Sequence, residues 1–186
     1  MIGAALIAFA ALSVVYSAMW RNETGLWQAT VIYHPECGRS YYNLGNAYRE
    51  MNDPTRAVQA YRKATQLVQD EELRFRAYAN LGTVLARSGV EDLALEYCEK
   101  ALALRPAEPA LLRLYGNLLA QKGRLDEAVA ALTEAWRLSP QTADLGHDLA
   151  RTLLKYDPPK IDEATSVYRR ALDGGAPADP KIEAKL

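Results

Sequence analysis

The sequence is poor in the residues that most often carry catalysis and metal binding. It has two histidines and two cysteines among 186 residues. His34 and His147 show no metal-ligand spacing, and Cys37 and Cys98 form no C-x-x-C motif. No glycine-rich phosphate loop and no Ser-His-Asp set is present. We therefore expect no enzyme activity, no metal and no cofactor; Cys98 is expected at a core-facing position as an inert thiol.

Net charge is also nearly absent. The 22 basic and 23 acidic side chains leave a formal net charge of −1. A chain so close to neutrality has no overall field that attracts polyanions. No nucleic-acid partner is expected.

Ionisable side chains are missing altogether from residues 1–20. About 20 apolar residues at 1.5 Å each match the hydrocarbon core of a bilayer, and Tyr16, Trp20 and Trp27 cluster at one end, where aromatic rings favour the headgroup zone. Residues 1–20 are predicted to be a single membrane-spanning helix. Two alternatives remain: a cleaved signal, for which the basic n-region is missing, and a buried soluble helix, which would need a larger core.

Small residues recur along this segment at helical spacing. A stripe of this kind permits close contact with another transmembrane helix. The residues are Ala4, Ala8, Ala11 and Ala18. Only Arg21 lies close to either end of the segment, so the positive-inside rule leaves the orientation open.

Most of the remaining chain repeats with a period of 34 residues. Gly82 and Gly116, and Pro106 and Pro140, are each separated by this step. A residue without a side chain lets two helices cross closely, Gly89 and Gly123 suit tight turns, and the prolines end helices. An earlier unit with the same pattern contains Tyr42-Asn43-Leu44-Gly45. Such a period predicts stacked helix pairs that bury their apolar faces against one another.

The predicted division of the chain follows from these repeats. A coupling helix, equivalent to half a repeat, is expected over residues 21–36, before a repeat region over residues 38–177. The four helix pairs are predicted at about 38–71, 75–108, 109–142 and 143–177, with a short tail at 178–186. The fourth pair is expected to pack least well, because Gly146 stands where earlier units have a large residue.

The first helices of such pairs are expected to line a concave groove. Arginines dominate the positions that face it, whereas acidic residues fall mostly on the second helices and the turns. A groove of this charge suits an extended acidic segment held by bidentate contacts. The predicted partner-binding residues are Arg39, Tyr42, Asn46, Arg49, Arg76, Thr83, Arg87, Arg113, Asn117, His147 and Arg151.

Over residues 38–138 the chain resembles the tetratricopeptide-repeat family in its Leu-Gly pairs, small residues and terminal prolines. The resemblance implies an all-α fold, a right-handed superhelix of antiparallel helix pairs that binds proteins without catalysis. Some members clamp a terminal carboxylate with a lysine and two asparagines. Asn46 and Asn80 match the two asparagines, but Tyr42 stands in the place of the lysine.

The junction before the first repeat shows a second, shorter resemblance. Trp20-Arg21-Asn22, Leu26-Trp27, Pro35 and the run from Tyr41 to Gly45 are similar to transmembrane-and-tetratricopeptide proteins related to protein O-mannosyltransferases. This resemblance implies repeats on the extracytoplasmic (periplasmic or luminal) side, in preference to the cytoplasmic side.

Two functions follow as hypotheses. The first is a membrane-anchored scaffold or adaptor whose groove holds a membrane-associated protein partner within a membrane complex. The alternative is the repeat portion or a subunit of a polytopic glycosyltransferase-like membrane enzyme, whose repeats would recruit its acceptor.

Overall fold

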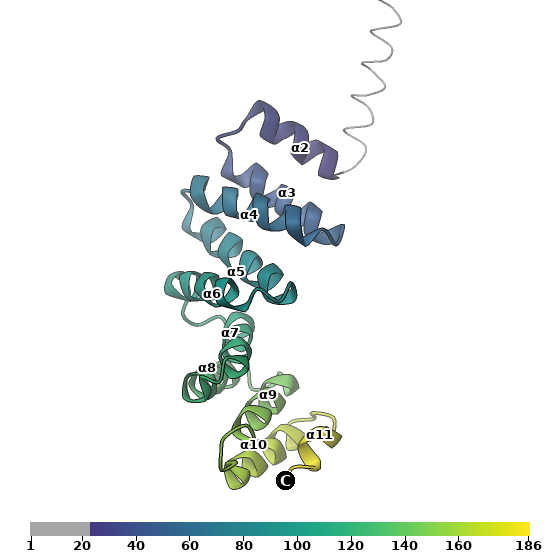
Figure 1. The fold of residues 1–186 in the computed structure, drawn as a ribbon, viewed down its shortest axis with the longest axis vertical. Helices are drawn as coiled ribbons and strands as arrows, with labels where there is room; N and C mark the ends of the chain where they lie inside the picture. Colours follow the sequence, from purple (N-terminus) through teal and green to yellow (C-terminus); the bar gives the residue numbers. More distant parts are fainter. Residues whose placement is uncertain (1–22) are drawn as a thin grey trace, which may run out of the picture. The chain divides into compact units, whose positions relative to one another are not determined.

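The computed structural model describes residues 23–186 (Figure 1). They belong to two compact units divided between Ser88 and Gly89. Unit 1 is described from residue 23 to 88 and unit 2 from 89 to 186, and each is treated by itself. The described residues form helices and turns, with no strand. The predicted anchor over residues 1–20, with its alanine stripe, and residues 21 and 22 of the coupling helix lie outside the described residues. Among the helices of residues 23–186, none has the length and hydropathy that a membrane span requires.

The described part of unit 1, residues 23–88, contains four helices joined by short turns. They are α2 (Glu23–Tyr33), α3 (Gly38–Glu50), α4 (Pro54–Leu67) and α5 (Glu71–Arg87). The Asp53 side chain accepts a hydrogen bond from the Arg56 amide at the start of α4, and Asp70 accepts one from the Leu73 amide at the start of α5. These carboxylates satisfy amides that have no partner inside the helix, so both helix starts are encoded locally.

A glycine–tyrosine contact sets the packing of α3 on α4. A Cβ at Gly45 would lie 2.6 Å from ring carbons of Tyr61, and the Tyr61 side chain is fully buried. The buried face of α4 is completed by Ala57, Ala60 and Ala64, at the i, i+3, i+4, i+7 spacing of one helix side. The predicted close crossing at this glycine is therefore confirmed.

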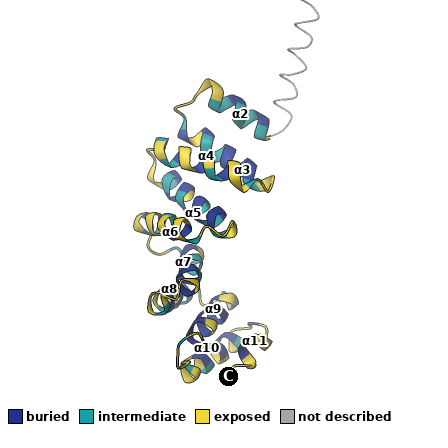
Figure 2. Ribbon diagram, in the orientation of Figure 1, coloured by how far each residue is buried: buried dark blue, intermediate teal, exposed yellow. Residues whose placement is uncertain are grey.

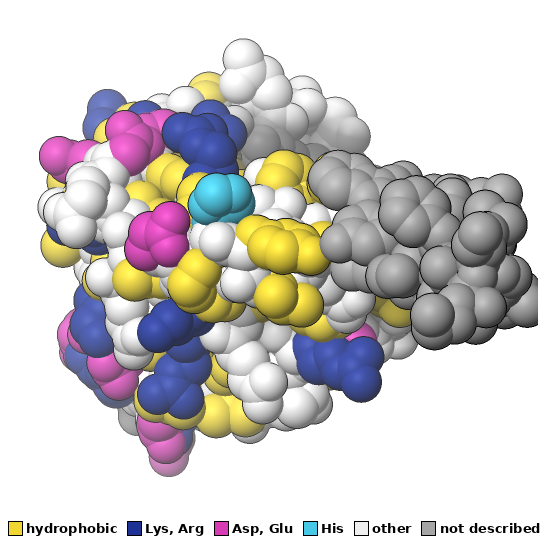
Figure 3. Space-filling view, turned by 90° about the horizontal axis from the view of Figure 1, so that it is seen from above, with side chains coloured by type: hydrophobic (Ala, Val, Ile, Leu, Met, Phe, Trp, Pro, Cys, Tyr) yellow, Lys and Arg dark blue, Asp and Glu magenta, His cyan; other side chains and the backbone are white. Residues whose placement is uncertain are grey.

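Helix α2 packs against α3, and the Gln28 side chain donates to the Tyr48 hydroxyl across 2.9 Å. Large hydrophobic side chains remain exposed at this end of unit 1, with Ile32 at 70% and Tyr33 at 63%. Hydrophobic side chains are visible among charged ones on the face seen from above in Figure 3.

Unit 2 contains six helices. They are α6 (Glu91–Leu104), α7 (Pro109–Gln121), α8 (Leu125–Leu138), α9 (Ala143–Leu153), α10 (Ile161–Asp173) and the short α11 (Pro180–Glu183). The turn between α7 and α8 places Gly123 at φ 77°, a backbone conformation that residues with a Cβ rarely adopt. The predicted turn role of Gly123 is confirmed, as is that of Gly89 at φ 74°.

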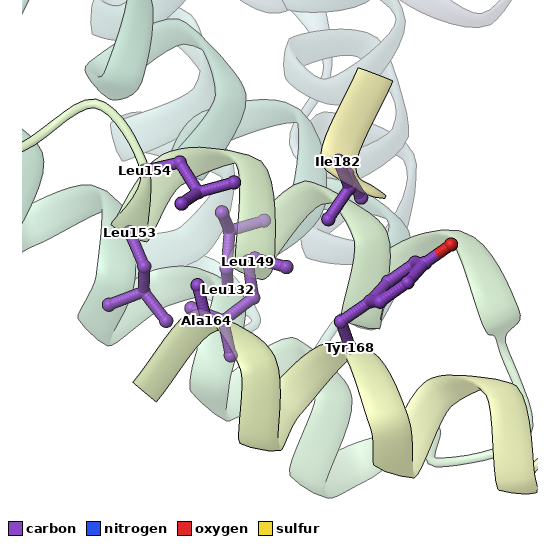
Figure 4. Close-up of a cluster of buried hydrophobic side chains, with 8 residues drawn as sticks. Leu132, Leu149, Leu153, Leu154, Ala164, Tyr168 and Ile182 are labelled. Atoms are coloured by element: carbon purple, nitrogen blue, oxygen red, sulfur yellow. The ribbon is translucent and has the colours of Figure 1, made fainter. Parts of the chain in front are cut away.

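The core of unit 2 is built in the same way as that of unit 1. A Cβ at Gly116 would lie 2.8 Å from Cγ of Leu132, so α7 and α8 also cross closely at a glycine. Figure 4 shows Leu132, Leu149, Leu153 and Tyr168 converging with Ile182 of α11. Burial follows one side of each helix in Figure 2, with exposed residues on the other.

Gly146 has a different role from the one that the sequence suggests. Its absent Cβ would lie 2.6 Å from Cβ of Ala171, so the glycine permits α9 and α10 to approach closely. The helices of this last pair bury Leu149, Leu153, Ala164 and Tyr168. The prediction of loose packing from a missing large residue overlooked this close approach. The boundaries predicted for the four repeats and the handedness of a superhelix stay predictions.

Candidate binding site

Four polar side chains of unit 1 form what we term the amide cluster: Tyr42 and Asn46 of α3, Tyr61 of α4 and Asn80 of α5. The Tyr61 hydroxyl donates to Oδ1 of Asn46 across 2.7 Å, and Nδ2 of Asn80 donates to the same oxygen across 3.1 Å. Nδ2 of Asn80 also lies 3.4 Å from the Tyr42 hydroxyl. The acceptor of Asn46 is therefore doubly occupied, which fixes the orientation of its amide.

Tyr61 is the buried support of this cluster. Its ring lies 6.0 Å from that of Tyr42, at an interplanar angle of 53°. Burial raises the pKa of Tyr61 to about 12, against a lowering by the charge of Arg49. The phenol consequently stays protonated at neutral pH and acts as a hydrogen-bond donor to Asn46.

The predicted arginines of unit 1 lie on α3 and α5, the helices that carry Asn46 and Asn80, and they differ in whether an acid pairs with them. Within residues 23–186, Arg39, Arg49 and Arg87 form no ion pair, and Arg39 and Arg87 are exposed whereas Arg49 is half-buried. Arg76, in contrast, pairs with Glu72 on its own helix across 2.6 Å. The Thr83 hydroxyl donates to the Ala79 carbonyl. Among the described residues, therefore, no acid neutralises Arg39, Arg49 or Arg87, and the same holds for Arg62, Lys63 and Arg74 elsewhere in unit 1.

Three of the four residues predicted in unit 2 converge on an acid that the sequence-based prediction missed. Asp148 of α9 is buried, with a side chain 6% exposed, and its Oδ2 accepts from Nε of Arg113 at 2.6 Å and from Nδ2 of Asn117 at 3.0 Å. Arg151 lies 3.5 Å from the other carboxylate oxygen. We call this set, with Asp144, the carboxylate cluster.

The arginines of the carboxylate cluster are neutralised within unit 2. Arg113 also pairs with Asp144 across 3.0 Å, and Arg151 lies 3.5 Å from Asp179. Partial burial lowers the pKa of Arg113, but the hydrogen bond and charge of Asp148 outweigh it and raise the pKa overall. These guanidinium groups hold α7, α9 and the tail of unit 2 together, so they offer little free charge to a partner.

His147 is not on an open surface. Its side chain is buried, its residue is 5% exposed, and its ring lies 5.6 Å from that of Tyr168. Nε2 has no hydrogen-bond partner among the described residues. The structure thus brings Tyr42, Asn46 and Arg49 together in unit 1 and Arg113, Asn117 and Arg151 in unit 2, with His147 packed inside.

The sequence contains a positional signal for each residue that the predicted site omitted. Asp144 and Asp148 are four residues apart and therefore lie on one face of α9, one turn from the predicted Arg151. Asn80 matches Asn46 in repeat position, and Tyr61 marks the second helix of the first pair. Spacing identifies these positions, but it does not show which side chains meet.

Comparison with known proteins identifies the repeat. Residues 38–70 and 80–143 match models of the tetratricopeptide repeat, and together the matches span just over half of the chain. Photosystem I assembly protein Ycf3 of Prochlorococcus marinus (strain MIT 9215) is 30% identical over 87 residues, covering 47% of this chain and 50% of that protein. Protein CTR9 homolog of Arabidopsis thaliana is 26% identical over 160 residues, covering 86% of this chain and 14% of that protein.

Solved structures share the fold. YrrB, described as a tetratricopeptide protein with an unusual peptide-binding site, has a TM-score of 0.76 at 24% identity, over 97% of this chain and 90% of that one. MamA has a TM-score of 0.72 at 19% identity, over 86% of this chain and 88% of that one. The chain spans about half of the Ycf3 protein from strain MIT 9215. None of the proteins named here supports the resemblance to O-mannosyltransferase-related proteins.

Proposed function

Because this chain belongs to the tetratricopeptide-repeat family, we propose that it is a scaffold that holds an extended segment of a partner protein against the amide cluster of unit 1. The observation that carries the proposal is the pattern of unused hydrogen-bonding groups on two neighbouring helices. Asn46 keeps both amide hydrogens, and Asn80 keeps its carbonyl oxygen, with respect to the described residues. Such a pair is complementary to a main-chain carbonyl and a main-chain N–H group.

The charge around the cluster favours an acidic segment. Arg49 lies one helical turn from Asn46, and Arg39 and Arg87 add unpaired positive charge in unit 1. A guanidinium group binds a carboxylate through two parallel hydrogen bonds, which adds both energy and orientation. In family members that clamp a terminal carboxylate, a lysine stands at the position of Tyr42. The proposed contacts are therefore with the main chain and the side chains along the segment, and not with its terminal carboxylate.

The relatives support a binding role without identifying the partner. Ycf3 is named as an assembly protein, and YrrB is described with a peptide-binding site. A scaffold function fits both descriptions, and the chemistry of the amide cluster supports binding rather than catalysis. Arg113 and Arg151 are not assigned to partner binding, because the carboxylate cluster already pairs them.

The decisive variant is Asn46→Asp. It keeps Oδ1 and replaces the amide NH2 group, with its two donor hydrogens, by the second oxygen of a charged carboxylate. The full chain is titrated against pools of fluorescein-labelled decapeptides with Asp or Glu at alternate positions, and fluorescence anisotropy is measured. The peptide pool that binds the parent chain most tightly should bind Asn46→Asp at least about tenfold more weakly. The reason is that main-chain carbonyls of the peptide would lose the N–H donors of Asn46.

The matched control is Asn43→Asp, which adds the same charge to α3 outside the amide cluster. It should leave affinity within about twofold of the parent chain. If both variants bound the peptides equally weakly, general charge repulsion would explain the loss of affinity. Unchanged affinity in Asn46→Asp, or no binding by any acidic pool, would refute the proposed function.

A separate proposal concerns residues 1–20 and the location of the protein. We propose that this segment anchors the scaffold in a membrane and that the partner is membrane-associated. The support is the run of 20 residues without an ionisable side chain, followed by Arg21. Alkaline carbonate should leave the full chain in the membrane pellet and release a variant that starts at Asn22. Protease protection of sealed vesicles then tells on which side the repeats lie.

A further inference from the structure

Unit 2 contains a surface groove that is separate from both polar clusters. It has a volume of about 480 Å³ and is lined by Thr133, Trp136 and Arg137 of α8, Pro140 after α8, and Arg170 of α10. Grooves of this size accommodate a few amino-acid residues. Arg137 and Arg170 are the cationic side chains of the lining and none of the five is acidic; because Glu134 pairs with Arg137, it is Arg170 that gives the groove a charge suited to an anionic ligand.

The aromatic wall of the groove is held in place by the core. Trp136 is half-buried and packs against the two hydrophobic clusters of unit 2, which include Leu132 and Leu145. Its Cζ2 lies 3.6 Å from the position of a Cβ at Gly146. The exposed part of the indole is therefore a rigid apolar surface that loses little side-chain entropy when a ligand binds.

A free guanidinium group lies over this indole. Cζ of Arg170 is 4.8 Å from the centre of the Trp136 ring, and Arg170 forms no ion pair within residues 23–186. Stacking covers the face of a guanidinium group and leaves its in-plane N–H groups available for a carboxylate. Arg137, in contrast, is held by Glu134 through two hydrogen bonds of 2.7 Å.

We propose that this groove, defined by Trp136 and Arg170, binds an internal segment of a protein partner in which an acidic and an apolar side chain lie two residues apart. The carboxylate pairs with the in-plane edge of Arg170, and the apolar side chain packs on Trp136 and Pro140. In an extended chain, residues i and i+2 point to the same side. A single short segment can therefore place its carboxylate on Arg170 and its apolar side chain on Trp136, the ring over which Arg170 lies.

This surface differs in position and ligand from the one assigned to the amide cluster. It lies on α8 and α10 of unit 2, whereas the amide cluster lies on α3, α4 and α5 of unit 1. The chain would therefore hold two segments, of one partner or of two. The two surfaces have no residue in common, so failure of one proposal is distinguishable from failure of the other.

The test uses the full chain and a labelled nonapeptide with both ends blocked, in which Glu and Leu are two positions apart in a Gly-Ser background. Binding is measured by fluorescence anisotropy. Arg170→Ala should weaken binding about tenfold, and Arg170→Lys almost as much, because an ammonium group keeps the charge but loses the planar, bidentate edge. Peptides with Gln for Glu, or Ala for Leu, should each bind at least about fivefold more weakly.

Arg169→Ala is the matched control, since it removes an exposed arginine beside Arg170 that does not line the groove. It should bind the peptide like the parent chain. Equal weakening by Arg169→Ala and Arg170→Ala, or tight binding by Arg170→Ala, would overturn the proposal. It would also be overturned if only a peptide with a free C-terminal carboxylate bound, because the ligand is defined by a side-chain carboxylate.

Discussion

Nε of Arg113 lies 2.6 Å from Oδ2 of Asp148, 35 residues further along the chain, and so joins α7 to α9. The carboxylate is nearly enclosed, at 6% side-chain exposure, whereas Arg113 is 34% exposed. A residue that the sequence assigns to partner binding thus has a structural role. Charge at a repeat position does not by itself indicate a free binding group, because the next repeat can supply its counterion.

Replacing Asp148 by Ala should destabilise unit 2. The substitution removes the acceptor of Arg113 and Asn117 and leaves two donors without their partner, which costs on the order of 2–3 kcal/mol. The free energy of unfolding, from urea titration followed by circular dichroism, should fall by this amount. Asp144→Ala is the control, because its carboxylate is 62% exposed and exposed pairs contribute about 1 kcal/mol or less. Equal losses in the two variants would contradict the prediction.

Gly45→Ala should destabilise unit 1 by about 2–3 kcal/mol. The added Cβ would lie 2.6 Å from two ring carbons of Tyr61, and this ring is buried and cannot move aside. Gly123→Ala meets no atom within 4 Å and should cost only about 1 kcal/mol, from its positive φ. Thermal unfolding of the two variants measures the difference. If Gly45→Ala lost less stability than Gly123→Ala, α3 and α4 would be able to move apart without a loss of folding free energy, contrary to the prediction.

Alkaline pH should expose the role of the Tyr61 phenol. Burial raises the pKa of Tyr61 from 10.0 to about 12. The contribution of the protonated phenol to the free energy of unfolding is therefore complete below pH 10 and is lost as pH rises towards 12. Tyr61→Phe lacks the hydroxyl that bonds Asn46 and should be about 1 kcal/mol less stable at pH 8. Urea titrations at pH 8, 10 and 11 should show this gap closing as pH rises. A gap that stays constant would mean that the phenol ionises in the folded chain as it does in water.

The helix crossings and turns were predictable from local spacing. Gly45 and Gly116 meet large side chains of the following helix, and Gly123 has the positive φ expected of a tight turn. Cys98 is buried as expected, and burial raises its pKa to about 12. Each of these features depends on one side chain and its immediate neighbours along the helix, so the sequence contains the necessary information.

The polar site was predictable only in part. The sequence places Asn46 and Arg113 on first helices, yet it contains no information on which oxygen each side chain meets. Asp148 is one of several acids with similar spacing, and its pairing with Arg113 depends on how α7 and α9 pack. The Trp136 groove was missed for the same reason, because α8 and α10 are brought together only by folding.

The sequence alone determined that this protein is built of tetratricopeptide helix pairs, because a 34-residue period of small residues and prolines forces helices to cross and end at fixed positions. Tertiary structure decided which arginines stay free. Arg113 and Asp148 are 35 residues apart in sequence and meet only through folding, so Arg113 is neutralised whereas Arg49 and Arg170 keep their charge unpaired among the described residues.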